Sequence, residues 1–288
     1  MDENLVTPLG TCPSPFQDST EVLLGHGSGG KLTADLIEQL FLPAFRNPYL
    51  EKLDDQAVVA VDGVRLAFTT DSYVVTPIFF PGGDIGQLAV HGTVNDLAMS
   101  GARPLYLSAA FILEEGLPLA DLACIVASMR DACATAGVVL VTGDTKVVNR
   151  GSGDRIFINT SGVGRIEHTR VISADQVRAG DRVILSGTIA DHGMAVMSKR
   201  EGLEFETEIM SDTAPLNSLV QTIMEVSPEM HCLRDPTRGG VATCLHEIAR
   251  RACVGMVLDE KSIPIREEVK GACEILGIDA SVEPSHPR

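Results

Sequence analysis

The chain has 288 residues, with 23 lysines and arginines against 39 aspartates and glutamates, so its formal net charge is −16. This length suits one large domain or two modest ones. A hydrophobic fraction of 44% is enough for a sizeable core and excludes global disorder. Such an acidic chain repels phosphate backbones, so nucleic-acid binding is excluded as its main role, whereas a nucleotide held through metal ions is not. No run of about 18 apolar residues predicts a membrane span.

The seven cysteines form no CxxC pair and are odd in number, which argues against a disulfide framework or a zinc site. Cys133 and Cys244 fall at apolar positions of helical patterns, so we expect them to be buried as small hydrophobic residues. The first 25 residues have no basic start followed by an apolar core, so no secretory signal is predicted. We expect a reducing, cytoplasmic environment.

The apolar pattern of the first half alternates between strands and helices. Residues 1–20 are rich in Pro, Ser and Thr and are interpreted as a flexible leader. The pattern then predicts a helix after Lys31, a hairpin from 57–61 and 66–70, a short strand at 73–75, a helix at 85–99, a strand at 105–113, a helix ending at Gly137, and strands at 138–142 and 156–158.

A domain boundary is predicted between residues 165 and 180, where the sequence becomes polar. We expect an N-terminal domain at 21–167 and a C-terminal domain at 168–288. The second domain should contain strands at 182–186 and 254–258, and helices around 194–197, 216–224, 241–252 and 269–276. The fold class that follows is mixed α/β (α+β) with two domains.

A glycine-rich loop covers residues 25–31 and reads G-x-x-x-x-G-K. It differs from a phosphate-binding P-loop because Leu32 stands where that motif has the Ser or Thr that holds magnesium. Three readings remain open: a true P-loop, a glycine-rich lid over a polyanion with Lys31 as a point charge, and a plain flexible turn.

Aspartates form a second set of candidates, because they stand at element ends or inside apolar runs, next to Gly, Thr or Asn. Such carboxylates are costly to bury unless they are paired or bind a cation. If they converge on one cleft, they predict a Mg²⁺ site that faces a triphosphate; helix capping and turn formation are the alternative for each one alone. The set comprises Asp54, Asp55, Asp71, Asp96, Asp144 and Asp235.

Eight strings together carry a resemblance to a known family. They are HGSGGK at 26–31, DDQA at 54–57, FTTDSYVV at 68–75, FFPGG at 79–83, NDLAM at 95–99, FILEEGLP at 111–118, GDTKVV at 143–148 and RDPTRGG at 234–240. From about residue 21 to about 279, the chain closely resembles the HypE family of nickel–iron hydrogenase maturation factors. This family belongs to the superfamily of aminoimidazole ribonucleotide synthetase, selenophosphate synthetase and thiamine-monophosphate kinase.

The resemblance implies a two-domain fold whose N-terminal domain forms a dimer-spanning β-barrel with flanking helices, followed by a C-terminal α/β domain. It implies that ATP lies in the cleft between the domains of a homodimer. The implied metal ligands, for Mg²⁺, are Asp55, Asp71, Asp96 and Asp235. The implied ATP-binding residues are Gly27, Ser28, Gly29, Gly30, Lys31, Asp71, Asn95, Gly143, Asp144 and Thr145.

The implied reaction is an ATP-dependent dehydration of a carbamoyl group carried on a C-terminal cysteine. The carbamoyltransferase HypF loads the group, ATP phosphorylates its oxygen, loss of phosphate leaves a thiocyanate, and the cyanide passes to iron on a HypC–HypD scaffold. Lys146 is a candidate for the base that removes the amide protons if the metal site lowers its pKa, or else a phosphate clamp that keeps its proton. Lys146 and Asp144 are therefore the expected catalytic residues.

The sequence departs from the family at its end. Family members continue past the Gly-Ile-Asp at 277–279 and finish in Pro-Arg-Ile-Cys, whereas this sequence ends in ASVEPSHPR. We expect a shortened C-terminal domain without the carrier cysteine, from a truncated chain, an altered reading frame, a natural isoform or a new activity. A non-catalytic ATP-binding dimer that docks maturation proteins and a small-molecule kinase are the alternative functions.

Overall fold

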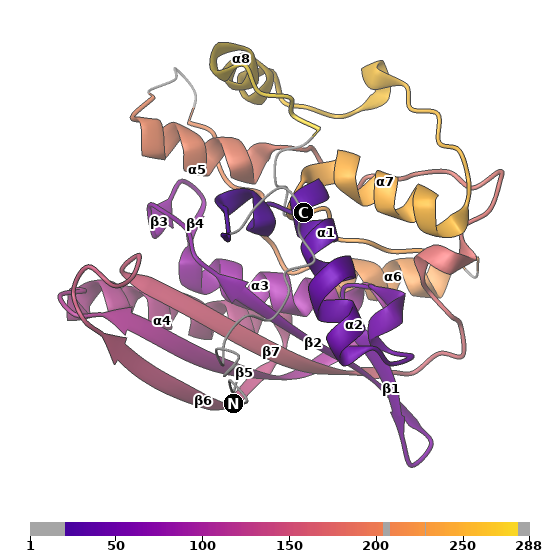
Figure 1. The fold of residues 1–288 in the computed structure, drawn as a ribbon, viewed down its shortest axis with the longest axis horizontal. Helices are drawn as coiled ribbons and strands as arrows, with labels where there is room; N and C mark the ends of the chain where they lie inside the picture. The colour runs from indigo at the N-terminus through magenta and orange to yellow at the C-terminus, as the bar shows by residue number, and fades with distance from the viewer. Residues whose placement is uncertain (1–20, 204–207, 228, 282–288) are drawn as a thin grey trace, which may run out of the picture. The chain divides into compact units, whose positions relative to one another are not determined.

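The computed structural model describes residues 21–203, 208–227 and 229–281, which divide into one compact unit up to Glu51 and a second from Lys52 onward (Figure 1). The first unit is a helical run: α1 (Lys31–Leu36) continues through a π-helical turn (Ile37–Phe41) into α2 (Leu42–Phe45). Pro43 lacks the N–H group that would extend a regular ladder, which accounts for the wider turn before it. The leader predicted at residues 1–20 lies outside the described residues.

The second unit is built on a five-stranded sheet with the order β1-β2-β7-β5-β6. Only β5 and β6 are parallel, and the other neighbours are antiparallel. A short hairpin, β3–β4, forms a separate pair. The strands are β1 (Ala57–Val61), β2 (Val64–Tyr73), β3 (Phe79–Phe80), β4 (Gly83–Asp84), β5 (Arg103–Glu114), β6 (Val139–Val148) and β7 (Ile156–Ile166).

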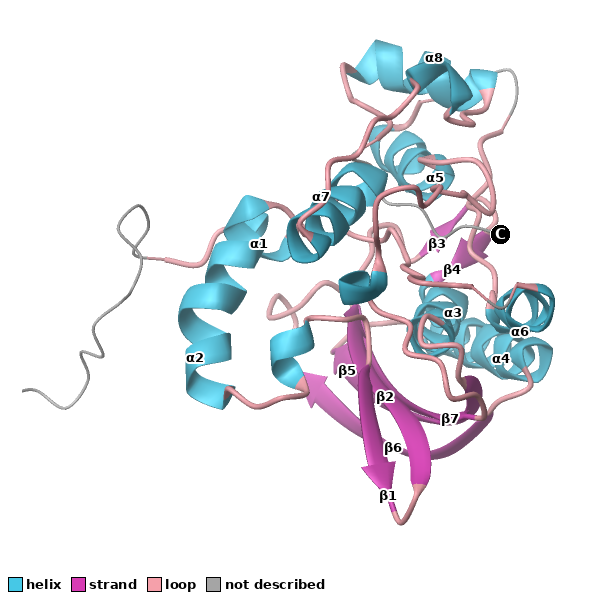
Figure 2. Ribbon diagram, turned by 90° about the vertical axis from the view of Figure 1, so that its right-hand side faces the viewer, coloured by secondary structure: helices cyan, strands magenta, loops and turns pink. Residues whose placement is uncertain are grey.

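Two helices, α3 (Ile85–Ala98) and α4 (Leu119–Ala136), cover one face of this sheet (Figure 2). Helix α3 begins where Asp84 accepts hydrogen bonds from the backbone of Gly86 and Gln87. Helix α4 ends at Gly137, which adopts the left-handed conformation that favours glycine, so the predicted helix end is confirmed. Among the described residues of the second unit, no helix lies over the opposite face of the sheet.

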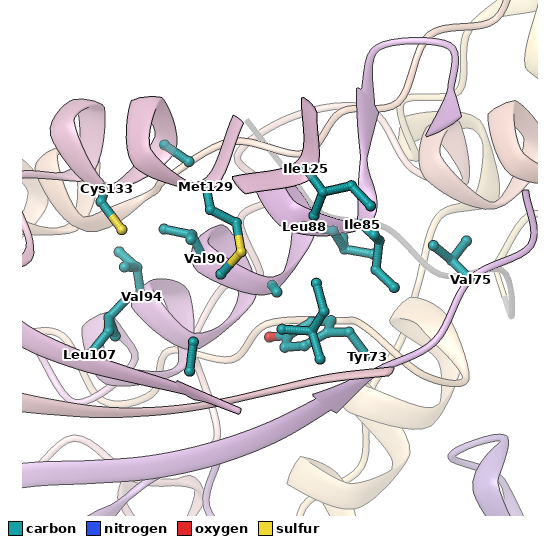
Figure 3. Close-up of a cluster of buried hydrophobic side chains, with 14 of the residues drawn as sticks. Tyr73, Val75, Ile85, Leu88, Val90, Val94, Leu107, Ile125, Met129 and Cys133 are labelled. Carbon is teal, nitrogen blue, oxygen red and sulfur yellow. The ribbon is translucent and has the colours of Figure 1, made fainter. Parts of the chain in front are cut away.

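The main core lies between α3, α4 and the sheet. Figure 3 shows Met129 and Cys133 of α4 directed toward α3, above Leu107 of β5 and Tyr73 of β2. The two helices approach closely at Gly86, where an added Cβ would lie 2.6 Å from the Ile125 carbonyl oxygen. The predicted burial of Cys133 and Cys244 is confirmed.

Further α-helices follow in the described part of the second unit, joined by long irregular segments: α5 (Asp191–Glu201), α6 (Asn217–Val226), α7 (Gly240–Ala252) and α8 (Glu267–Leu276). Helices α5 and α8 share one apolar cluster, and α6 packs against the end of α3 in another. Asp191, fully buried at the start of α5, accepts a 2.5 Å hydrogen bond from Nε of Arg266, which precedes α8. This ion pair joins the two helices.

Two predicted strands are wrong. Residues 182–186 and 254–258 have extended or irregular backbone but pair with no strand in the described ranges. An unpaired strand leaves its backbone donors and acceptors to water, and the side chains of Val183, Ile184 and Val257 are indeed exposed. Of the strand predicted at 73–75, only Tyr73 lies in a strand, where it is the last residue of β2. Among the described helices, none has the length and apolar character needed to span a bilayer. The predicted domain boundary stays a prediction.

Candidate functional site

Four aspartates from distant parts of the sequence lie close together in the second unit. Asp55 precedes β1, Asp71 lies in β2, Asp96 lies in α3, and Asp235 precedes α7. The hydroxyl oxygen of Thr69 lies 2.9 Å from both the Asp55 carbonyl oxygen and Asp96 Oδ2, which joins loop, strand and helix. The charges of Asp55, Asp71 and Asp235 all act on the Asp96 carboxyl. The four residues are called the acidic cluster below.

Burial controls protonation in the acidic cluster. It raises the pKa of Asp55 to about 6, against the opposing charge of Arg234. It also raises the pKa values of Asp96 and Asp235 well above the usual range, and the neighbouring carboxylates add to both rises. Buried carboxyls of this kind lose their protons near neutral pH only when a positive charge comes close. The cluster therefore gains stability from any bound cation.

Within the acidic cluster, the carboxyl group of Asp235 is the one best suited to bind a cation. Its side chain is 6% exposed, and both carboxyl oxygens are buried without a hydrogen-bond partner in the described part of the chain. Such an orphaned group is costly unless a ligand satisfies it. No three His, Cys, Asp or Glu side chains in the described ranges are close enough to share one ion. A cation here would therefore take one or two of these carboxylates and complete its coordination with water or a ligand.

Two arginines of the 234–240 loop reach the acidic cluster, and the sequence patterns did not single them out. Arg234 Nη1 lies 3.2 Å from Asp55 Oδ1, and its Nη2 donates to Glu247 at 2.8 Å. Arg238 Nη2 lies 3.4 Å from Asp71 Oδ1. Charged residues in a glycine-containing loop are usually solvated, so only the fold reveals that these two meet carboxylates.

Asp212 is a further residue that sequence reasoning missed. It is 3% exposed, and its charge contributes to the raised pKa of Asp235, after burial and Asp55. Its segment is fixed on both sides: Ser211 Oγ lies 2.9 Å from His192 Nδ1, and Thr213 Oγ1 lies 3.2 Å from His91 Nδ1. No glycine loop or strand end marks Asp212 in the sequence, so the aspartate pattern could not include it.

Asn95, an expected ATP ligand, is engaged elsewhere in this structure. Its Nδ2 donates to the Ala214 carbonyl oxygen at 3.0 Å, and its Oδ1 accepts from the Leu216 backbone at 2.7 Å. The side chain is fully buried. Both polar atoms therefore hold the segment that enters α6.

The expected residues Gly143, Asp144, Thr145 and Lys146 lie within β6, not after a strand. The register places Asp71, Thr160 and Gly143 on the helix-covered face, because each pairs in turn with its neighbour across β7 and β5. Asp144 lies on the other face, as does Lys146, two residues further along. Strands β2 and β6 are three strand spacings apart, about 14 Å. Within one chain, Asp144 and Lys146 are thus remote from the acidic cluster.

The glycine loop belongs to the first unit and forms a compact turn. A 3₁₀ helix covers Leu24–Gly27, Ser28 Oγ donates to the Gly25 carbonyl oxygen, and the backbone of Gly29 donates to Thr33 Oγ1 at 2.9 Å. Gly30 caps α1, and the exposed Lys31 is its first residue. A P-loop would follow a strand, so the 3₁₀ helix argues against that reading.

The fold and the acidic cluster define a class of proteins. Residues 53–166 match the family model of the N-terminal domain of AIR synthase related proteins, and residues 178–281 match the model of its C-terminal domain. Thiamine monophosphate kinase from Aquifex aeolicus has a similar fold, with a TM-score of 0.65 at 21% identity over 87% of each chain. The chain is thus of the AIR synthase related class.

Relatives with about half of their residues identical to this chain identify its family within this class. The carbamoyl dehydratase HypE of Azotobacter vinelandii is 56% identical over 88% of this chain and 74% of its own length, and that of Escherichia coli is 48% identical over 90% and 78%. A HypE–HypF complex contains a chain with a TM-score of 0.83 at 52% identity, covering 87% of this chain and 81% of the other. A structure of HypE in complex with ATP has a TM-score of 0.76 at 50% identity. The match covers 92% of this chain and 79% of the other. This chain belongs to the HypE family of carbamoyl dehydratases.

Proposed function

We propose that this chain is an ATP-dependent carbamoyl dehydratase that converts a cysteine-bound carbamoyl group into a thiocyanate, the source of the cyanide ligand of nickel–iron hydrogenase. The observation that carries the proposal is the orphaned carboxyl of Asp235 within the acidic cluster of a HypE-family chain. A buried cation site beside four carboxylates suits phosphoryl transfer, in which the protein supplies positioning and charge.

The chemistry requires activation of a poor leaving group. The carbamoyl oxygen leaves with difficulty as hydroxide, whereas a phosphorylated oxygen leaves as phosphate. Phosphorylation of the oxygen releases the first proton from nitrogen and leaves a C=N double bond. The second proton is lost as the C–O bond breaks, phosphate leaves and the C≡N bond forms. A base close to this nitrogen accelerates the step, and the site must keep water from the phosphorylated intermediate.

The acidic cluster would hold the divalent cation, Mg²⁺ in this proposal. The cation would neutralise the nucleotide phosphates and stabilise charge that develops during phosphoryl transfer. Asp235 provides two oxygens that lack partners, and the Thr69 hydroxyl orients Asp96. Gly27, Ser28, Gly29, Gly30 and Lys31 would contact the triphosphate as a glycine-rich lid, since their backbone and the exposed lysine are suited to a polyanion.

A second copy of the chain would complete the site. Asp144 and Lys146 lie on the helix-free face of β6, which is one of the two edge strands of the sheet. The same face exposes Phe68, Tyr106 and Ile112 by 44–50%, and an apolar sheet face with an open edge favours association. In a homodimer, β6 of one copy would bring Asp144, Lys146, Gly143 and Thr145 to the cluster of the other.

Lys146 would then act on the substrate as base or as phosphate clamp, and Asp144 would lie near the phosphates. A similar chain forms a HypE–HypF complex, and we propose the same carbamoyltransferase as the partner here. A HypC–HypD scaffold would receive the cyanide. The chain would work in the cytoplasm, where its free cysteines stay reduced.

The test is phosphate release with Mg²⁺ and ATP, with and without a carbamoylated peptide that ends in Pro-Arg-Ile-Cys. Peptide-dependent phosphate release together with thiocyanate, detected by mass spectrometry as loss of water from the peptide, is the expected result. A D235N variant should lose both signals, and an R130Q variant, changed at an exposed helical arginine, should keep them. Phosphate release that ignores the peptide would favour a small-molecule kinase, and nucleotide binding without turnover would favour a docking dimer.

A further inference from the structure

The two arginines that flank Asp235 are held in different ways. Arg234 is 14% exposed and binds three acceptors: Asp55, Glu247 and the Leu53 carbonyl oxygen. Arg238 is 55% exposed, and its Nη2 lies 3.4 Å from Asp71 Oδ1 and 3.1 Å from the Ser72 carbonyl oxygen. A long contact at an exposed side chain contributes little stability. Arg234 is therefore a fixed part of the loop, and Arg238 can leave at low cost.

Arg238 also lies against a carboxylate oxygen of Asp71. Asp71 Oδ1 accepts the backbone N–H of Ser72 at 2.8 Å and faces the Arg238 guanidinium on another side. Asp71 lies in the cluster, where its charge acts on both Asp96 and Asp235. A guanidinium beside this carboxylate competes with a divalent cation for the same negative charge.

The backbone that follows Arg238 forms a close turn into α7, and the Arg238 side chain is exposed. Gly239 and Gly240 have φ values of +75° and +58°, in the left-handed region that favours glycine. A Cβ at Gly239 would lie 2.4 Å from Thr243 Oγ1, so the turn into α7 has no room for a side chain at position 239. This turn places Arg238 two residues before α7, with its guanidinium beside Asp71 and Ser72.

We propose that Arg238 exchanges partners: it covers Asp71 before a cation binds, and once displaced it binds a phosphate oxygen of the nucleotide. This inference rests on the proposed function only for the identity of the nucleotide. An arginine is suited to both states, because its planar fork matches carboxylate and phosphate oxygens alike. The exchange would couple cation arrival to nucleotide binding, since the cation frees the residue that the phosphate then uses.

The test separates the two states by measuring binding, not turnover, in R238Q. Without nucleotide, Mn²⁺ affinity followed by electron paramagnetic resonance should rise about two- to five-fold, because a competing charge is lost. With Mg²⁺ present, affinity for a non-hydrolysable ATP analogue, measured by calorimetry, should fall about ten-fold, because a charge-assisted contact to phosphate is lost. In both assays, the affinity of R238K should lie between those of the wild type and R238Q, and the affinity of R130Q should match that of the wild type.

A higher Mn²⁺ affinity together with a lower affinity for the ATP analogue in R238Q supports the exchange. If both affinities fall together with the melting temperature, Arg238 is structural and the proposal is wrong. A weaker or unchanged Mn²⁺ affinity in a normally folded R238Q also overturns it, as does a wild type that binds no Mn²⁺. Neither assay needs the peptide, so failure of the dehydratase proposal would show separately as absent peptide turnover.

Discussion

Asn95 and Asp96 are consecutive in α3, yet their side chains bind opposite neighbours: Asn95 holds the backbone of residues 214–216, and Asp96 accepts from Thr69 in β2. Successive helical residues point about 100° apart, so one helix can serve both sides. Helix α3 thereby fixes the segment that carries Asp212 and presents a carboxyl to the acidic cluster. The pair links the architecture of the second unit to its site.

Replacing Asn95 by Ala should destabilise the protein. The substitution leaves the Leu216 N–H and the Ala214 carbonyl without their shared partner in a buried position, which costs about 1–3 kcal/mol for each unsatisfied group. Urea unfolding measures this loss. T222A removes only an exposed hydroxyl that bonds within α6, and should change stability by less than about 0.5 kcal/mol. A stable N95A with weakened ATP binding would instead support direct contact with the nucleotide.

The D96N substitution should stabilise the cation-free protein increasingly as the pH rises. The pKa of Asp96 is raised in the fold by burial and by neighbouring carboxylates, so the folded state favours the protonated form. Its ionisation therefore opposes folding from about pH 4, near the ordinary pKa of aspartate, upward through its raised folded pKa.

The difference in unfolding free energy between D96N and wild type should thus be near zero at about pH 4 and reach about 1 kcal/mol or more at about pH 8. Denaturant unfolding at several pH values measures it. Added Mg²⁺ should narrow the difference at high pH, because it stabilises only the wild-type carboxylate. A difference that stays constant with pH would contradict the pKa assignment.

Replacing Arg266 alone should lower the stability of the protein more than replacing both Arg266 and Asp191. Asp191 is fully buried and accepts from Arg266 and from Thr188, so R266M leaves a buried charge without its cation. Breaking such a pair typically costs about 3–5 kcal/mol, whereas replacing both partners by apolar residues is far milder. Thermal unfolding of R266M and of D191L/R266M compares the two. Equal losses would show that the pair acts only through packing.

Much of the fold follows from the sequence, because long apolar patterns specify α3, α4, α7 and the central strands locally. Aspartates in apolar surroundings predicted that several would converge, but the pattern also included Asp144, which lies in β6. The family resemblance, not the pattern, selected the four members of the acidic cluster. The arrangement of arginines was not predictable, because an arginine in a loop carries no periodic signal. The strands expected at 182–186 and 254–258 failed because strand formation depends on a partner strand, which local pattern cannot reveal.

Mixed dimers test whether Asp144 acts across the dimer. D235N and D144N should each be inactive alone, whereas their equimolar mixture should recover about a quarter of wild-type activity. Half of the dimers would be mixed, and each of these would have one intact site. The assay is peptide-dependent phosphate release after co-refolding. Mass spectrometry verifies that the subunits have exchanged. If activity is then not recovered, Asp144 does not act together with the acidic cluster of the other copy.

The most direct test of the account is a crystal structure with Mn²⁺ and a non-hydrolysable ATP analogue, with the metal located by its anomalous scattering. The account predicts an Mn²⁺ peak about 2.1 Å from a carboxyl oxygen of Asp235. The same ion should also coordinate a phosphate oxygen of the nucleotide and at least one other residue of the acidic cluster. A nucleotide bound with its metal away from Asp235, or an Asp235 that still lacks any ligand, would contradict the central claim.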